Sequence, residues 1–332
     1  MRLTVGVGTS GPSVSLVSLN QMKPSEATSA LCLMVSPAPL ALPGRACWNA
    51  GSMRIELTGR QPLLRRDIRA CVADEGWLTL DAGRLSFASP LDLAAMVALA
   101  HNVPQGTRVG LVVPRDIRTA SYLQRMDVLR RLPVGTEIDG RLPEEQRTDC
   151  SGTLLEVSPL LPSTVQELVN RVGRLTSEQL MTGVAGLAFR GAGELIDNAT
   201  SHGHSQLGAF LCAQTYTGAT SGRVGFEFAV CDTGIGVLAH LRGNPAYLRV
   251  PDSRTAIAWA LQRGVSGTTE QRGNGLADLL QFTQEGGVGR LVIRSGHGVV
   301  SVAQRGHYRR DAYTAAATGI TGTWAWLRVR FP

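Results

Sequence analysis

The residues best suited to chemistry lie in the stretch GELIDNATSHGH, at positions 193–204. Glu194 and Asn198 are four positions apart, and the apolar spacing of the preceding residues is typical of a helix. Side chains at positions i and i+4 share a helix face, so a carboxylate and a carboxamide would point to the same place. A carboxylate can polarise an attacking water or hydroxyl, and an amide oxygen is a hard ligand for a metal. The pair suits a magnesium–nucleotide site, although an exposed polar stripe has the same pattern.

A first glycine-rich turn, DTGIG, begins at Asp232, where an apolar strand pattern ends. A carboxylate held at a strand end can accept a hydrogen bond from the exocyclic amine of adenine. Gly234 and Gly236 would let the backbone pass beneath the base and into a turn. Turns of this kind are common at strand ends, so the motif alone also fits a purely structural loop.

A second glycine-rich turn, RGNGL, lies directly before a helical pattern. The backbone N–H groups of Gly273 and Gly275 can approach a ligand closely, and the N-terminus of the helix that includes Leu276 favours a phosphate charge. Alone, this turn also fits an ordinary loop. The order of the motifs is more informative: the Glu194 box, the two glycine turns and a Gly-Thr pair ending at Thr323 follow one another along the chain.

In these motifs and their order, residues 162–332 resemble the GHKL superfamily, the ATPases and kinases of the gyrase, histidine-kinase and MutL type. The resemblance implies a Bergerat-type α/β (α+β) fold, a two-layer sandwich of helices on a mixed, largely antiparallel sheet. It also implies ATP and Mg²⁺ as ligands.

The resemblance gives each motif residue a role. Glu194 matches the general base of the ATPase members, Asn198 the magnesium ligand and Asp232 the carboxylate that reads adenine. Thr323 matches a hydroxyl that supports the adenine contact. The other cofactor-binding residues belong to the two glycine boxes: Gly234, Gly236, Gly273, Gly275 and Leu276.

By the same resemblance, residues 243–272 correspond to the ATP lid, a mobile segment that closes on nucleotide. Within it, RGVSGT at 263–268 carries an arginine and hydroxyls that could reach phosphates, but the sequence also suits a Gly/Ser loop. His202 is expected to support the site and His204 to lie on the surface, because no other residues with metal-ligand spacing accompany them.

Periodic patterns predict the elements that must position these motifs. Gly191 and Gly193, inside a helical pattern, suggest close packing or backbone approach to a ligand. The expected elements of this half are helices at 163–175 and 177–202, a helix opening at 272–284, strands at 206–216 and 223–232, a hairpin-like pair at 290–305 and a closing strand at 321–331.

The preceding segment, 53–143, is predicted to form a small α/β domain with parallel or mixed strands. Its expected elements are strands at 53–57, 76–81 and 107–114 and helices at 89–103 and 117–132. The stretch LTLDAGRLSFASPLDLAAMVALA resembles a STAS domain, the fold of anti-sigma-factor antagonists. In that family a phosphorylatable serine follows an aspartate at the helix start. Here Ser89 and Pro90 hold those positions, which favours a helix N-cap at Ser89 over a phosphorylation site.

Composition limits the remaining choices. The chain has 332 residues, room for two domains, and no apolar run near the roughly 18 residues of a membrane span. Residues 1–52 are expected to be disordered or an over-extended start, and 144–161 a linker. The net charge of +7 comes from scattered arginines, Lys23 being the only lysine, so nucleic-acid binding is not indicated. The six cysteines lack metal spacing and suit reduced thiols of a cytoplasmic protein.

A sensor histidine kinase would need a long helical hairpin with a phosphoacceptor histidine before the ATP site, but residues 144–190 contain none. The gyrase and MutL types need a transducer domain with a catalytic lysine, which this sequence does not supply. A short GHKL domain behind a STAS-like one resembles the anti-sigma-factor serine kinases and their antagonists instead. We therefore expect a cytoplasmic ATP-binding regulator, a serine kinase or slow ATPase acting on an anti-sigma, sigma or STAS-type partner, with a homodimer as an option. The alternative is a non-catalytic module in which ATP orders the lid and shifts a binding equilibrium.

Overall fold

The computed structural model describes residues 52–63, 69–73, 76–144, 147, 149–180, 182–201, 208–218, 224–267, 275–277, 279–280, 289–305, 307–314 and 319–330. These residues belong to one compact unit of the chain, Gly44–Pro332. The expectation of a disordered or over-extended start at 1–52 concerns residues almost entirely outside the described part. Within that part, no helix combines the length and the apolar character needed to cross a membrane.

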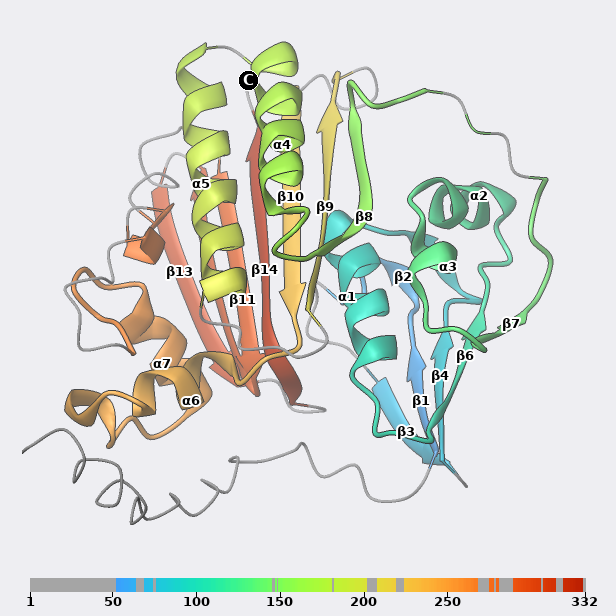
Figure 1. Cartoon of the computed structure of the whole chain (residues 1–332), viewed down its shortest axis with the longest axis horizontal. Coiled ribbons are helices and arrows are strands. Elements are labelled where there is room, and N and C mark those ends of the chain that lie inside the picture. Colours follow the sequence, from blue (N-terminus) through green and yellow to red (C-terminus); the bar gives the residue numbers. More distant parts are fainter. Residues whose placement is uncertain are drawn as a thin grey trace, which may run out of the picture. The chain divides into compact units, whose positions relative to one another are not determined.

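A five-stranded mixed sheet organises the N-terminal half, in the order β3-β1-β4-β6-β7 (Figure 1). Strand β1 pairs antiparallel with β3 and parallel with β4, and the parallel pairing continues through β6 to β7. This confirms the predicted α/β character of the segment. The strands are β1 (Ser52–Glu56), β3 (Arg69–Ala73), β4 (Trp77–Asp81), β6 (Arg108–Val112) and β7 (Glu137–Asp139), and a separate parallel pair joins β2 (Gly59–Arg60) to β5 (Leu85–Phe87).

The helices of this half differ in part from the prediction. Helix α1 (Pro90–His101) matches the expected one, but the single helix expected at 117–132 is wrong. The structure has α2 (Ile117–Arg125) and α3 (Val128–Arg131) instead. They are separated by Asp127, whose backbone is left-handed with φ of 58° and therefore cannot continue a helix. The Asp127 carboxylate accepts a hydrogen bond from Arg147 at 2.8 Å, which holds the break in place.

A seven-stranded sheet organises the C-terminal half, in the order β13-β12-β11-β14-β10-β9-β8, and all of its pairings are antiparallel. Helices α4 (Val165–Gln179) and α5 (Thr182–Ser201) cover one face (Figure 1). The strands are β8 (Leu154–Leu160), β9 (Ala209–Tyr216), β10 (Gly225–Asp232), β11 (Gly289–Gly296), β12 (Gly298–Arg305), β13 (His307–Thr314) and β14 (Ile320–Arg330). The chain is thus mixed α/β with a large antiparallel sheet.

Two of these strands lie where no strand was predicted. Strand β8 falls inside 144–161, the segment expected to be a linker, and its leucines and Val157 are buried at the edge of the sheet. Strand β13 has the sequence HYRRDAYT, which lacks an apolar alternation because it is the outermost strand beyond β12. The predicted strands at 206–216 and 223–232 and the hairpin-like pair at 290–305 are confirmed by β9, β10, β11 and β12.

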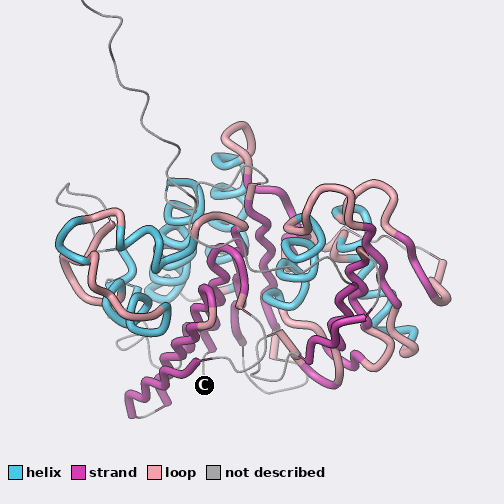
Figure 2. The backbone as a smooth tube through the Cα atoms, turned by 90° about the horizontal axis from the view of Figure 1, so that it is seen from below, coloured by secondary structure: helices cyan, strands magenta, loops and turns pink. Residues whose placement is uncertain are grey.

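Helix α1 joins the two sheets. It is apolar all round and buried on every side, and it packs against β9 and β10 of the larger sheet. In Figure 1, α1 lies between the strands of the two sheets, and Figure 2 also shows a helix between strands of the two sheets. Leu80 of β4, Leu93 of α1 and Trp326 of β14 belong to one hydrophobic core. Cys212 and Cys231 are buried free thiols in the same core, as the strand patterns predicted.

Ser89 is the N-cap of α1, which confirms the capping interpretation. Its hydroxyl accepts the backbone N–H of Asp92, and the Asp92 carboxylate accepts the backbone N–H of Ser89 at 2.7 Å, so the two residues form a capping box. The same carboxylate accepts the backbone N–H of Leu63 at 2.7 Å. Ser89 and Asp92 are fully buried, so a kinase could reach the Ser89 hydroxyl only if the start of α1 opened.

Replacing Ser89 with alanine is expected to lower the free energy of unfolding by about 1 to 2 kcal/mol, because the buried cap loses its partner. Urea denaturation followed by circular dichroism measures the change. Asp116→Ala is the matched control, since Asp116 caps α2 through the Thr119 N–H at 3.1 Å but is exposed. The free energy of unfolding should fall by less in this control than in Ser89→Ala. An unchanged urea midpoint in Ser89→Ala would contradict the capping role.

Candidate functional site

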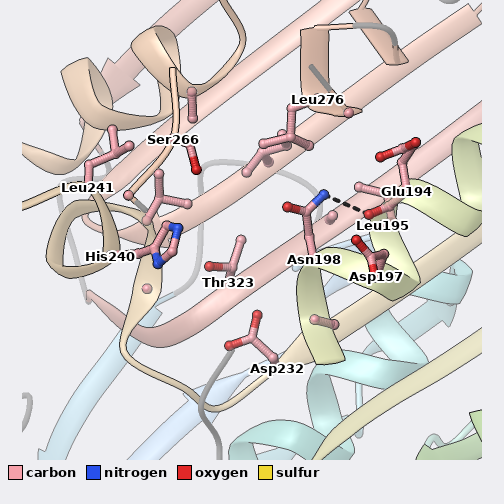
Figure 3. A pocket seen from close by; sticks show the side chains of 18 of the residues that line it. Glu194, Leu195, Asp197, Asn198, Asp232, His240, Leu241, Ser266, Leu276 and Thr323 are labelled. Carbon is pink, nitrogen blue, oxygen red and sulfur yellow. Dashed lines mark hydrogen bonds between the residues drawn. The ribbon is translucent and has the colours of Figure 1, made fainter. Parts of the chain in front are cut away.

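The predicted motif residues meet at one pocket of about 310 Å³ (Figure 3). Its walls come from α5, from the turn after β10 and the helix that follows it, from 265–267 and from Gly275 and Leu276, with β14 behind them. Seven of the nine predicted site residues line it: Glu194, Asn198, Asp232, Gly236, Gly275, Leu276 and Thr323. Gly234 is next to the pocket and contacts Asp232, whereas Gly273 lies outside the described residues.

Helix α5 places Glu194 and Asn198 on the same wall of the pocket, as their spacing predicted. The Asn198 amide nitrogen donates to the backbone carbonyl of Glu194 at 2.6 Å. This bond leaves the amide oxygen on the side of the pocket (Figure 3). Asp197, an exposed carboxylate on the next position of the helix, also lines the pocket and was not predicted. Beside the apolar Leu195 and Ala199, this wall thus presents the oxygen atoms of Glu194 and Asn198, which suit a cation or a polarised water.

The expectation of close packing at Gly193 is wrong. A Cβ atom at that position would meet nothing within 4 Å, so packing within the described chain does not require the glycine there, and backbone approach to a ligand stays a prediction. Gly191, two positions earlier, is buried. The glycine that approaches Glu194 is Gly275 of the second glycine turn, where a Cβ atom would collide with the Glu194 carboxylate.

Asp232 ends strand β10 at the buried end of the pocket and is 5% exposed. Burial raises the pKa of its carboxyl from 3.8 to about 7, against the opposing effect of the backbone N–H groups of Gly234 and Thr323. The Gly234 N–H donates to Asp232 Oδ1 at 2.8 Å. Ionisation of this carboxyl is therefore unfavourable in the empty pocket, and a ligand that donates a hydrogen bond to it would favour the charged form.

The last strand passes directly against Asp232. Gly322, just before Thr323, has a left-handed backbone with φ of 79°, and a Cβ atom there would collide with the Asp232 backbone. Gly236 is also left-handed, with φ of 77°. The first glycine turn and the Gly-Thr pair thus need glycine for conformation and for space, a requirement that the motif indicated only in general terms.

The segment after the first glycine turn is folded. It comprises α6 (Gly236–Arg242), a 3₁₀ turn at Pro245–Tyr247 and α7 (Ser253–Ala260). Residues 265–267 then return to the pocket, held by a hydrogen bond from the Asn244 amide to the Ser266 carbonyl at 3.0 Å.

Of the predicted closing element, Ser266 and Gly267 line the pocket, while the exposed Arg263 is not among the described lining residues. His240 of α6 also lines it and lies against Gly267. Sequence reasoning missed His240, because a histidine on a short helix carries no distinctive pattern. Thr268 lies outside the described part of the chain, as do His202 and His204.

A metal at this site would need ligands beyond the protein. Among the described side chains, no group of three or more His, Cys, Asp or Glu residues could hold an ion. Glu194 and Asn198 offer oxygen ligands, and Mg²⁺ often takes one or two protein ligands together with substrate phosphates and waters. The donor set therefore fits Mg²⁺ when a phosphate-bearing ligand supplies the remaining oxygens.

No protein-family model matches the sequence, and no curated protein matches it either. The assignment of the site depends on its motifs and geometry.

Proposed function

We propose that the pocket binds ATP together with Mg²⁺ and that the protein is an ATP-binding regulator of the GHKL type. One observation carries the proposal. Four motifs that are far apart in the sequence contribute residues to a single pocket, with a carboxylate at its buried end and Gly275 of the second glycine turn on another wall. In Figure 3, Asp232 and Leu276 lie on opposite sides of the pocket.

The buried end suits adenine. The Asp232 carboxylate would accept a hydrogen bond from the exocyclic amine, and the Thr323 hydroxyl lies beside it in the lining. The side walls of the pocket are largely apolar and would hold a planar base: Leu195, Val230, Leu241, Val265, Ile293 and Ala325. The volume is within the range of small-molecule sites.

The opposite wall suits phosphates. Gly275 of the second glycine turn and Leu276 line this wall, and a glycine lets the backbone approach a phosphate closely. Asn198 would hold Mg²⁺, which neutralises phosphate charge when bound. Glu194 stands at this end, so its carboxylate could accept the proton of an attacking water or of a partner's serine hydroxyl. The phosphoryl group would then pass from ATP to that oxygen as the bond between the γ-phosphorus and the β–γ bridging oxygen breaks, and ADP would leave.

The surrounding fold supports the same proposal. Two helices on one face of a largely antiparallel sheet agree with a Bergerat-type sandwich, and a five-stranded sheet with α1 agrees with a STAS-like domain. We infer an anti-sigma, sigma or STAS-type protein as the partner and a cytoplasmic location. The alternative of a non-catalytic, ATP-switched module draws on the position of 265–267, because a nucleotide that contacts this lid segment would change its conformational equilibrium.

Calorimetric titration of the full chain with MgATP, MgGTP and adenosine tests the proposal. We expect binding of MgATP and adenosine, little binding of MgGTP, and weaker binding of ATP but not of adenosine when EDTA removes the metal. Absence of binding by both ATP and adenosine would refute the nucleotide site. The proposal of a kinase activity would be refuted if no phosphate were transferred from ATP to any STAS or sigma partner.

Gly275→Ala is expected to weaken MgATP binding by at least tenfold, because the new methyl group collides with the Glu194 carboxylate and displaces either the carboxylate or the backbone at 275. Adenosine binding should change by less than threefold, since the base binds at the other end. Gly193→Ala is the matched control: its Cβ is unobstructed, and alanine should stabilise α5 by up to about 1 kcal/mol without changing either affinity. Equal ATP affinities in the two variants would remove Gly275 from the phosphate end.

A further inference from the structure

Ser295 links two of the segments that form the adenine end of the pocket. It lies in β11, 1% exposed, and no motif in the sequence marks it. Its hydroxyl accepts the backbone N–H of Val237 at 2.9 Å and donates to the backbone carbonyl of Gly322 at 2.9 Å. Val237 is the second residue of α6, directly after the first glycine turn, and Gly322 lies in β14 directly before Thr323.

The β14 segment at this point is irregular. Ser295 pairs with Thr323, but the next residue of β11, Gly296, pairs with Ile320. Two residues of β14 are therefore extra in the register and form a bulge, and one of them is Gly322. Bulges re-aim neighbouring side chains, and this one brings the β14 backbone against Asp232.

The packing around the Ser295 hydroxyl is tight. A Cβ atom at Gly236 would lie 2.7 Å from Ser295 Oγ and 3.1 Å from the Gly322 carbonyl. The Thr323 hydroxyl is 3.5 Å from Ser295 Oγ. Both glycines have left-handed backbones, so neither segment could adopt its conformation here with a larger residue. The Ser295 hydroxyl is the side-chain group that joins the two backbones.

Contacts on the opposite face of β11 also fix the position of this strand. Arg294 is 2% exposed, donates to the Leu63 carbonyl at 2.9 Å and lies over the Trp324 ring at 5.4 Å. Arg294 also pairs with Trp324 in the register of the sheet. Strand β11 is thus held next to the bulge from both of its faces, so the hydroxyl of Ser295 has a defined place.

We propose that Ser295 is a positioning residue for base recognition: it holds the first glycine turn and the β14 bulge together so that Asp232 and Thr323 face the base. The inference rests on the proposed function. Without the hydroxyl, the Val237 N–H and the Gly322 carbonyl would be left without this partner in a buried region, so the two segments would rearrange. Because Ser295 would affect only the recognition of the base, its loss should weaken the binding of adenosine and of ATP equally.

Ser295→Ala tests the inference by calorimetric titration with adenosine and with MgATP. Both dissociation constants should rise by the same factor, about tenfold. The matched control is Ser301→Ala, which removes a buried hydroxyl on the neighbouring strand β12, 3.3 Å from Arg290 Nε and outside the pocket lining. Ser301→Ala should leave both constants within about twofold. The pH at which adenosine affinity is half lost should also rise in Ser295→Ala, because the N–H donors to Asp232 are displaced.

The outcomes separate the inference from the proposed function. Wild-type protein that binds neither ligand overturns both. Wild-type binding with equal adenosine affinity in Ser295→Ala and Ser301→Ala overturns the role of Ser295 alone. If Ser295→Ala does not fold, Ser295→Cys replaces it, because cysteine has similar size but forms only weak hydrogen bonds. The same comparison of adenosine affinities then applies, while Ser295→Thr, which keeps the hydroxyl, should retain binding better than the cysteine variant.

Discussion

Asp232→Asn is expected to weaken adenosine and MgATP binding about 10- to 100-fold at pH 8 and to stabilise the ligand-free protein at the same pH. The loss follows from the hydrogen bond between a charged carboxylate and the adenine amine, which is worth about 1.5 to 3 kcal/mol. Calorimetric titration of the wild type and the variant measures it. Asp197→Asn is the matched control, because Asp197 lines the same pocket as an exposed carboxylate. It should leave adenosine affinity within about threefold.

The gain in stability follows from the buried charge. The pKa of Asp232 is raised by burial from 3.8 to about 7 in the folded protein. A group with a raised folded pKa contributes stability that is complete below the unfolded value and is lost as the pH rises through the folded value. A rise of this size corresponds to about 4 kcal/mol at pH 8. The asparagine variant carries no such charge, so its advantage over the wild type should narrow as the pH falls from 7 toward 4.

Urea denaturation of the ligand-free proteins at pH 5 and pH 8 checks the stability effect. Equal stabilities of wild type and Asp232→Asn at both pH values would show that Asp232 is not a buried charge. Unchanged adenosine affinity would show that this carboxylate does not read the base. The two results are independent, because the first concerns the fold and the second the ligand.

Adenosine binding by the wild type should weaken as the pH falls from 8 to 6. The carboxylate form of Asp232 accepts the hydrogen bond from adenine, and below its pKa of about 7 the empty pocket holds the protonated form. Affinity should then fall by up to about tenfold for each pH unit below this pKa. Adenosine is the better probe because it carries no titrating phosphate. Asp232→Asn should show a flat profile, and a flat profile in the wild type would contradict the assignment.

Local patterns predicted the parts of the site that depend on local geometry. Glu194 and Asn198 share a wall of the pocket because helical periodicity fixes the positions of side chains four residues apart. Asp232 ends a buried strand, as its apolar run indicated. In these cases the sequence neighbours of a residue determine where its side chain lies.

The contacts between distant segments could not be predicted in this way. Ser295 contacts Val237 and Gly322, which are 58 and 27 residues away along the chain, and a serine in a strand carries no signal for either contact. The apolar sequence of α1 indicates a buried helix but does not show that the second sheet covers it. Strand β13 was missed because its polar residues have no apolar alternation. In each case, tertiary packing supplies what local sequence patterns lack.

Glu194→Gln is expected to separate catalysis from switching. Glutamine preserves the size of the side chain beside Gly275, where there is no space for a Cβ atom, so MgATP affinity should stay within about threefold of the wild type. Glutamine cannot accept the proton of the attacking hydroxyl. If the protein is a kinase or an ATPase, the rate of phosphate release or transfer should therefore fall about 10²- to 10⁴-fold. Labelled ATP, with phosphate release and partner phosphorylation measured in parallel, provides the readout.

The same variant has a different result if ATP acts only as a switch. The nucleotide would still contact the lid at 265–267 and change its equilibrium, so ATP-dependent binding of the partner would be the same in wild type and Glu194→Gln. Asp197→Asn is the control, because Asp197 is an exposed carboxylate further along α5. It should leave both the turnover of ATP and the ATP-dependent binding of the partner unchanged. Loss of turnover with retained MgATP affinity supports the catalytic role of Glu194. Retained regulation of the partner in the absence of turnover supports the switch. The two outcomes differ because both mechanisms use the same pocket but only catalysis needs a base.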